Sequence, residues 1–422
     1  MRRRAAREAA TVVLAAGIAA VSAGFAKLVR ELIHRSSGWF YGDENVTDAL
    51  RTVTRAAPAV LITVGILAAR WLNARAQAWQ PGRLGIEAIA RSAQGQPPGP
   101  SLRATLLKSL ATMAACVPGT SLGRESAILE TGGALGCFAG RRTGLNGPAL
   151  ASAGVAAAFA SAYHAPFGAV AYVGSHLGVW RDRRSLTYAV GGSLFADWLT
   201  VHHLGGHAIF PGTRDSVASL LVLGAVAVVP AFVGARLFVR LRDRLSAWSF
   251  GRSHPRTVLA GSIVVSVGIV LVAPLSAGNG MEALRHVAVS GSFAAAAALG
   301  IGKLVATSAT LNAKAPGGVV APTLAVSAGW VLATYAVLER IGIDLPGSHW
   351  GGMIIGMAVG AAVGLHSPLM ASVMVAEMCG QTGMIPFTAA GAFLAHRGVH
   401  MLDRFDRSRH VSVPAAFHPE DE

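Results

Sequence analysis

Charge is scarce in this sequence. Asp, Glu, Lys and Arg make up 14% of the 422 residues, whereas soluble globular proteins carry about 25%. Acidic residues are the rarer kind, with 21 Asp and Glu against 36 Lys and Arg. The hydrophobic fraction is 53% and the mean hydropathy is +0.50. This composition excludes a disordered chain and an ordinary soluble enzyme, and it is typical of a polytopic membrane protein.

Cysteine is equally scarce. The three cysteines, Cys116, Cys137 and Cys379, lie far apart in apolar segments. Their spacing excludes a disulfide framework and a zinc site. The sequence also lacks a nucleophile elbow, a phosphate-binding loop and an HExxH motif. We therefore expect no enzymatic activity, no cofactor and no bound metal.

The basic residues are almost all arginines, and they cluster at the ends of apolar runs. Such placement is typical of the positive-inside rule for membrane proteins, whereas a nucleic-acid interface needs a basic stripe or a docking motif. We therefore expect no nucleic-acid partner and a multi-pass protein of a bacterial inner membrane. The clusters are Arg2–Arg4, Arg141–Arg142, Arg181–Arg184, Arg236–Arg244 and Arg397–Arg409.

Several apolar runs are long enough to cross a bilayer, which takes about 20 helical residues. Two others are interrupted, at Ala165-Pro166 and at Ser367-Pro368. The first of these predicts two short helices, 149–163 and 166–179. Broken helices at membrane depth are tolerated where the backbone is buried or lines an aqueous path, so they favour a transporter or channel. The uninterrupted spans predicted are Ser216–Ala235, Val258–Met281 and Ala315–Leu338.

The sequence contains an internal duplication. Gly85–Ile89 matches Gly280–Leu284 at an offset of 195 residues, and Gly154–Pro166 matches Gly356–Pro368 at an offset of 202. We therefore predict a single transmembrane domain spanning 1–422, with structural repeats at 8–204 and 216–400 and no C-terminal regulatory domain. Paired broken segments in two halves point to a transport site near the bilayer midplane. The matches alone leave parallel and inverted repeats both open.

Two glycine-containing turns, 117–126 and 315–322, each precede a predicted helix. A turn of this kind exposes unpaired N–H groups beside the positive end of the helix dipole, which makes an anion site without formal charge. Such a site binds weakly enough to release the anion again. The alternative interpretation is that the glycines only allow helices to pack closely.

Glu125 lies at the start of the helix that follows the first turn. A carboxylate within an apolar stretch is costly and is functional by default. Placed there, Glu125 would compete with a permeant anion for the same N–H groups, and protonation would release it. The sequence therefore predicts a pH-sensitive gate. The alternative is a first-turn carboxylate that only stabilises its helix.

Four segments match motifs of a known family: Gly123-Arg124-Glu125, Gly317–Pro322, Ala158–Phe167 and Glu377-Met378. On these segments the sequence resembles the CLC family of chloride channels and chloride/proton antiporters. The resemblance implies an all-α fold with an inverted-topology internal repeat and many tilted, broken helices. It also implies homodimers with one pore in each subunit and a gating glutamate at Glu125.

The resemblance also implies an anion path with three contributing segments. Leu84 stands where well-known members carry an anion-coordinating serine, and no tyrosine follows Tyr335 to serve as the family's pore tyrosine. We therefore expect a looser or differently built inner constriction. The predicted anion-binding residues are Gly123, Arg124, Ser126, Ala127, Gly318, Val319, Val320, Ala321, Leu84, Gly85 and Ile86.

His176 aligns with the internal proton-transfer glutamate of the antiporters. Histidine can carry protons near neutral pH, so a proton path through His176 is one interpretation. The other is a helix-end residue beside the basic loop Arg181–Arg184. Lys314, next to the second turn, either raises the anion potential there or extends to the membrane interface.

We therefore expect transmembrane transport of chloride or a similar small anion, either channel-like or loosely coupled to protons. One alternative is a strict chloride/proton or fluoride/proton antiporter that uses His176. An alternative of another class is a transport-inactive membrane protein that binds or assembles with a partner. The expected partners are the anion, the lipid bilayer and a second copy of the chain, together with protons where transport is proton-coupled.

Overall fold

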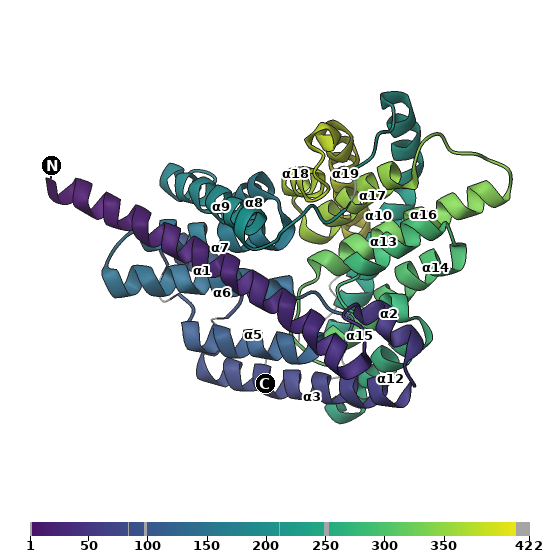
Figure 1. Cartoon of the computed structure of the whole chain (residues 1–422), viewed down its shortest axis with the longest axis horizontal. Coiled ribbons are helices and arrows are strands. Elements are labelled where there is room, and N and C mark those ends of the chain that lie inside the picture. Colours follow the sequence, from purple (N-terminus) through teal and green to yellow (C-terminus); the bar gives the residue numbers. More distant parts are fainter. Residues whose placement is uncertain (1, 83, 97–98, 211, 249–252, 411–422) are drawn as a thin grey trace, which may run out of the picture.

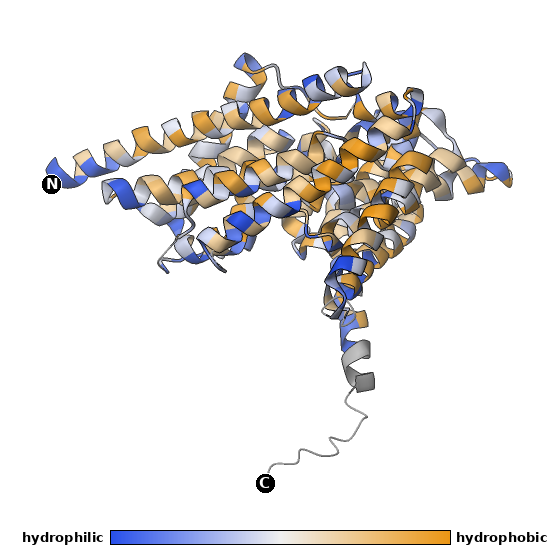
Figure 2. Ribbon diagram, turned by 90° about the horizontal axis from the view of Figure 1, so that it is seen from below, coloured by the Kyte–Doolittle hydropathy of each residue, from blue (hydrophilic) through white to orange (hydrophobic). Residues whose placement is uncertain are grey.

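The computed structural model describes residues 2–82, 84–96, 99–210, 212–248 and 253–410. Helices dominate these ranges, and the β pairing within them is one isolated bridge, Gly123 with Gly318. Six helical segments in the described chain are long and apolar enough to cross a membrane. Apolar residues cover most helices, while the N-terminal end of α1 is hydrophilic (Figure 2). The predicted all-α polytopic membrane fold is confirmed.

The first half of the chain contains nine helices within its described residues. The long helix α1 runs diagonally across the front of this half (Figure 1). The helices are α1 (Arg2–Tyr41), α2 (Val46–Thr52), α3 (Ala56–Trp79), α4 (Ile86–Ala93), α5 (Leu102–Cys116), α6 (Glu125–Thr143), α7 (Gly147–Tyr163), α8 (Pro166–His176) and α9 (Arg183–His203).

The second half repeats this pattern of long and short helices. Its segment between α14 and α15 is a π-helical turn, and two short 3₁₀ turns precede α13 and α19. The elements are α10 (Val217–Ala247), α12 (Pro255–Val272), η1 (Pro274–Ser276), α13 (Met281–Ser290), α14 (Phe293–Ala297), η2 (Ala298–Gly302), α15 (Lys303–Asn312), α16 (Val320–Arg340), α17 (His349–Leu365), α18 (Pro368–Met378), η3 (Thr382–Met384) and α19 (Ile385–His410).

Both predicted breaks occur, and they have the same construction. α7 ends at His164 (φ 53°) and α17 at His366 (φ 52°), both in the left-handed region that ends a helix. Pro166 and Pro368 then begin α8 and α18, where a missing N–H costs nothing. The departures from the prediction are that α7 begins at Gly147, two residues early, and that α8 ends at His176, three residues early.

Two of the predicted uninterrupted spans are wrong in their limits. Val258–Met281 is not one helix, because α12 ends at Val272 and Pro274 opens a 3₁₀ turn that leads into a loop. The helix expected from Ala315 begins only at Val320, because the Gly317-Gly318 turn comes first. The remaining span, Ser216–Ala235, continues as α10 to Ala247.

Glycines allow α6 and α7 to pack backbone against backbone. A Cβ atom on Gly132 would clash with the carbonyl oxygen of Gly154, and one on Gly154 would clash with that of Gly132. Gly136 meets the carbonyl of Leu150 in the same way. Close packing through small residues, which is common in membranes, thus accounts for these helix glycines.

The two repeats are inverted, as contacts between α8 and α18 show. Near the end of α18, Glu377 accepts hydrogen bonds from the N–H groups of Phe167 (3.2 Å) and Gly168 (2.8 Å) at the start of α8. At the other end, Ser367 before α18 donates to Ser175 in the last turn of α8 (3.1 Å). The helices are therefore antiparallel. The repeat limits 8–204 and 216–400 stay predictions.

Candidate functional site

The two glycine turns meet in the structure. The N–H of Gly123 donates to the carbonyl oxygen of Gly318 (3.0 Å), and the N–H of Gly318 donates to that of Gly123 (2.7 Å). These turns come from opposite repeats, so the bridge joins the two halves at one point. The starts of α6 and α16, which follow the turns, are thereby brought together.

Glu125 is buried against this bridge. Its side chain is 5% exposed, and Oε2 has no hydrogen-bond partner in the described chain. A Cβ atom on Gly123 would lie 2.5 Å from Oε2, and one on Gly318 would lie 3.3 Å from it. The carboxylate therefore occupies space that exists because both residues are glycine.

Asn279 holds the other carboxylate oxygen, and the sequence analysis missed it. Its Nδ2 donates to Glu125 Oε1 (3.1 Å), while its Oδ1 accepts the N–H of Met281 (3.1 Å). The second bond fixes the orientation of the amide, so a donor faces the carboxylate. The available signal was an asparagine between Gly278 and Gly280, in the segment that repeats the Gly85 turn.

A buried lysine supports the loop that carries Asn279. The ammonium of Lys303 donates to the carbonyl oxygens of Gly278 (2.8 Å) and Ser276 (3.1 Å), and to Ser121 Oγ (3.3 Å). Lys303 is 0% exposed. Gly280 has a φ of +92°, and a Cβ there would lie 2.6 Å from Lys303 Cε. Lys303 thus holds the loop in place and leaves room only for a glycine at Gly280, next to Asn279.

Lys108 is the counterpart of Lys303 in the first repeat, at the same offset of 195 that relates Gly85 to Gly280. A Cβ on Gly85 would lie 3.3 Å from Lys108 Nζ. Lys108 forms an ion pair with Glu130 of α6, at 2.8 Å. The sequence analysis did not single out this pair, although two charges inside apolar stretches were a usable signal.

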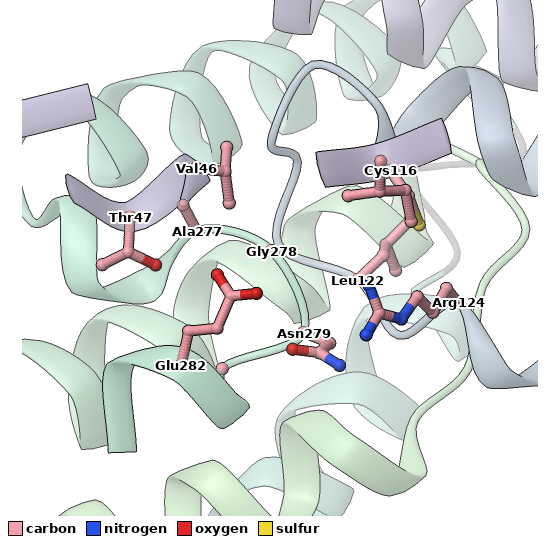
Figure 3. A pocket seen from close by; sticks show the side chains of 11 residues that line it. Val46, Thr47, Cys116, Leu122, Arg124, Ala277, Gly278, Asn279 and Glu282 are labelled. Atoms are coloured by element: carbon pink, nitrogen blue, oxygen red, sulfur yellow. The ribbon is translucent and has the colours of Figure 1, made fainter. Parts of the chain in front are cut away.

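A cavity of about 260 Å³ opens beside Glu125, and its ionisable lining contains three arginines and three histidines against two glutamates. Positive side chains around a cleft raise the local concentration of anions. A second, smaller cavity shares Arg124, Asn279 and Glu282 with the first (Figure 3). The ionisable side chains that line the larger cavity are Arg30, Arg124, Arg285, His34, His164, His207, Glu125 and Glu282.

The predicted N–H donors divide into two groups. The N–H groups of Gly123 and Gly318 donate to each other's carbonyl oxygens in this conformation, and the assignment of these two residues as anion ligands stays a prediction. At the helix starts, the N–H groups of Glu125, Ser126, Val320 and Ala321 have no acceptor among the described residues. Arg124 and Val319 stand immediately before those starts, whereas the N–H of Ala127 is already bonded to the carbonyl oxygen of Arg124 (3.2 Å).

The third predicted segment, Leu84–Ile86, lies near α6 at a different turn from the one that carries Glu125. Gly85 (φ +87°) precedes the first residue of α4 and faces the Lys108–Glu130 pair. Glu130 lies five residues beyond Glu125 on the same helix. The segment is therefore separate from the Glu125 site. Lys314 is exposed and adopts a left-handed conformation (φ 65°) just before the second turn.

His176 connects to the site through a column of aromatic rings. Its ring stacks on Tyr172 with centroids 4.3 Å apart. Tyr172 and Phe159 are 4.8 Å apart, and Phe159 and Tyr163 are 4.9 Å apart. Tyr163 lines the larger cavity with Glu125, and its buried hydroxyl has no partner in the described chain.

This fold and site define a class of protein: a membrane transport protein in which inverted repeats meet around a buried carboxylate. The family model described as voltage gated chloride channel matches residues 60–398. The chain belongs to this family, which confirms the resemblance seen in the sequence. It is a multi-pass protein of a bacterial inner membrane.

Relatives and solved structures agree with this assignment. The voltage-gated ClC-type chloride channel ClcB of Citrobacter koseri is 31% identical over 67% of this chain and 70% of its own. ClcB of Salmonella typhimurium gives the same three values. The structure of a slow cyanobacterial Cl⁻/H⁺ antiporter has a TM-score of 0.75 at 18% identity, covering 92% of this chain and 94% of its own. A CLC-type fluoride/proton antiporter has a TM-score of 0.64 at 17% identity, with the same coverage. At these identities the solved structures show the fold.

We predict that Gly123→Ala destabilises the protein. The new Cβ would lie 2.5 Å from Glu125 Oε2 and 2.7 Å from the carbonyl oxygen of Gly318, and overpacking of this kind costs about 1–3 kcal/mol. The measurement is the melting temperature of the purified protein in detergent. Gly17→Ala is the control, because no atom lies within 4 Å of its Cβ position. Equal melting temperatures for Gly123→Ala and the wild type would contradict the close approach.

Proposed function

We propose that this protein carries chloride or a similar small anion across the bacterial inner membrane, with Glu125 as its gate. The observation that carries the proposal is the position of Glu125, buried at the bridge between two repeats and beside a basic cavity. The family assignment and the names of the relatives support the choice of chloride. Transport rather than enzymatic catalysis follows from the same family.

The proposed gate works by competition for one place. The Glu125 carboxylate lies beside the starts of α6 and α16, whose first N–H groups have no acceptor among the described residues. An anion needs the same donors and the same positive ends of helix dipoles. When Glu125 moves away, the anion is held by Arg124, Ser126 and the Val319–Ala321 segment. Since most of these donors are neutral N–H groups, binding stays weak enough for release.

Asn279 stabilises the closed position of this gate through its hydrogen bond to Glu125, which we call the latch. Its amide donates to the carboxylate in the closed position, and a hydrogen bond to a charged group contributes about 1.5–3 kcal/mol. Because Met281 holds the amide and Lys303 holds the loop, the donor is oriented before the carboxylate arrives. The latch therefore favours the closed state over a state in which chloride occupies the same place.

The inner end of the protein favours channel-like or loosely coupled transport over strict exchange. Ser175 and His176 stand where the antiporters that the sequence resembles carry two glutamates. With Leu84 in place of a serine, the inner segment also lacks a coordinating hydroxyl. We further propose a homodimer with one anion path in each subunit, as the family resemblance implies.

The second candidate function is a strict chloride/proton or fluoride/proton antiporter. The column from His176 through Tyr172 and Phe159 to Tyr163 favours it, since it links the inner end of α8 to the cavity beside Glu125. Two tyrosine hydroxyls and one imidazole lie along this column, and imidazole exchanges protons near neutral pH. The phenyl ring of Phe159 carries no proton, so water would have to bridge that step.

We expect Glu125→Gln to remove the pH dependence of chloride flux. The amide keeps the shape of the side chain without its charge, so it no longer competes with chloride as an anion. The measurement is chloride efflux from liposomes at neutral and acidic pH, where the wild type is expected to be slower at neutral pH. Empty liposomes and liposomes with the Gly17→Ala variant are the controls. Wild-type behaviour of Glu125→Gln at both pH values would support a transport-inactive assembly protein or another gate.

We expect Asn279→Ala to strengthen chloride binding by about tenfold, the equivalent of one charge-assisted hydrogen bond. Without the latch the carboxylate is displaced at lower chloride concentrations. Chloride titration by calorimetry in detergent measures the change. Asn312→Ala is the matched control, since it removes a similar bond to Ser262 (3.0 Å) on another face. The effect should vanish in the Glu125→Gln background, and weaker binding in Asn279→Ala would reverse the role we assign.

The His176→Ala variant distinguishes channel-like transport from strict anion/proton exchange. Paired chloride and proton fluxes are recorded in liposomes under a chloride gradient. Channel-like transport predicts chloride flux without uphill proton movement in both the wild type and His176→Ala. Uphill proton movement that is lost in His176→Ala would establish the antiporter instead, and the same assay with fluoride would then identify the preferred anion.

A further inference from the structure

We propose that the N-terminal end of α1 and the start of α9 form a binding site for an anionic phospholipid. The site is distinct from the anion path and does not depend on how that path is gated. It consists of an apolar groove along the two helices and a basic pocket at one end of the groove. The two cavities share Glu8 and Arg184, so they are adjacent.

The groove between α1 and α9 has the properties of an acyl-chain site. Its volume is about 700 Å³. Val12 is 56% exposed and Phe195 37% exposed, so these apolar side chains lack a protein cover in the described chain. Figure 1 shows α1 and α9 on the same side of the first half. The apolar side chains and glycines that line the groove are Val12, Ala15, Ala16, Gly191, Gly192 and Phe195.

The pocket at the end of the groove has the properties of a headgroup site. It has a volume of about 650 Å³. Arg184 pairs with Glu8 (2.8 Å), and Arg7 donates to the carbonyl oxygen of Gly144 (2.6 Å), which fixes both guanidinium groups. No hydrogen bond or ion pair joins the side chain of Arg3 or Arg4 to another described residue. They leave positive charge at the pocket without a partner.

The charges that line the two cavities favour an anionic ligand. Glu8 is the single acidic residue among the described residues that line the two cavities, against Arg3, Arg4, Arg7, Arg183 and Arg184. A zwitterionic headgroup would leave this excess uncompensated, whereas a phosphodiester with net negative charge neutralises part of it. Basic residues near a membrane surface attract anionic lipid headgroups.

The direction of the site fits a lipid rather than a free anion. The basic pocket lies at the hydrophilic end of α1, and the apolar groove continues from it towards the hydrophobic part of the helix (Figure 2). The starts of α1 and α9 and the turn between α6 and α7 all meet there. These arginine-rich ends belong on the cytoplasmic side by the positive-inside rule. A lipid of the inner leaflet would therefore have its phosphate at the pocket and one chain in the groove.

The experiment measures the melting temperature of the purified protein in a neutral detergent. Phosphatidylglycerol, phosphatidylcholine with the same chains and glycerol phosphate are titrated separately. A bound ligand raises the melting temperature in a saturable way. We expect saturation with phosphatidylglycerol at concentrations at least about tenfold lower than with phosphatidylcholine, and no rise with glycerol phosphate. Equal responses to the two lipids would overturn the proposal, as would an equal response to glycerol phosphate.

Two variants test the two halves of the site. Arg3→Gln/Arg4→Gln should weaken the response to phosphatidylglycerol by at least about tenfold. Arg244→Gln/Arg256→Gln is the charge-matched control, at the ends of α10 and α12 outside these cavities. Wild-type lipid affinity in the Arg3/Arg4 variant would refute the headgroup pocket.

The groove is tested by filling it. Gly191 lines the groove and has no atom within 4 Å of its Cβ position, so Gly191→Leu is expected to fold and to block the chain. Gly261→Leu is its control, at an equally open glycine of α12. Loss of the phosphatidylglycerol response in Gly191→Leu alone supports the site. A changed oligomeric state in Gly191→Leu would instead identify the groove as a contact between copies of the chain and overturn the lipid assignment.

Discussion

A buried carboxylate at the junction of two glycine turns is the constraint on which the site depends. Burying Glu125 is costly, because a charge loses its hydration in a low-dielectric interior. The cost is offset by the Asn279 amide and by the positive ends of α6 and α16. The bridge between Gly123 and Gly318 brings these helix starts together. Without it the two halves would not meet beside Glu125.

The two inverted repeats share their backbone geometry but carry different side chains at equivalent positions. Lys108 and Lys303 occupy equivalent positions beside equivalent glycines, yet one pairs with Glu130 and the other binds backbone carbonyls. Ser175 and Glu377 are equivalent by the offset of 202, and only Glu377 has a carboxyl group. Arginines line both the cavity beside Glu125 and the pocket at the start of α1. The two repeats thus place different ionisable groups at equivalent positions.

Much of the fold could be predicted because membrane helices follow local rules. Uncharged runs, proline breaks and arginine-rich ends are properties of neighbouring residues, so α7 and α8 occur nearly as predicted, as does the break between α17 and α18. The prediction of one uninterrupted span over Val258–Met281 is wrong because mean hydropathy does not detect the turn that begins at Pro274. Glu125 was identified for a similar local reason, as a carboxylate at a helix start in an apolar stretch.

The sequence by itself determined the class of protein, the duplication and the position of the gate candidate, since each follows from composition or from matches along the chain. The tertiary structure decided which groups meet. It set the equivalent helices α8 and α18 antiparallel, and it paired the N–H groups of Gly123 and Gly318 with each other's carbonyl oxygens. It also placed Asn279 on Glu125, although the two residues are 154 positions apart. Contacts of this kind depend on how α6, α13 and α16 pack, and no local pattern encodes that packing.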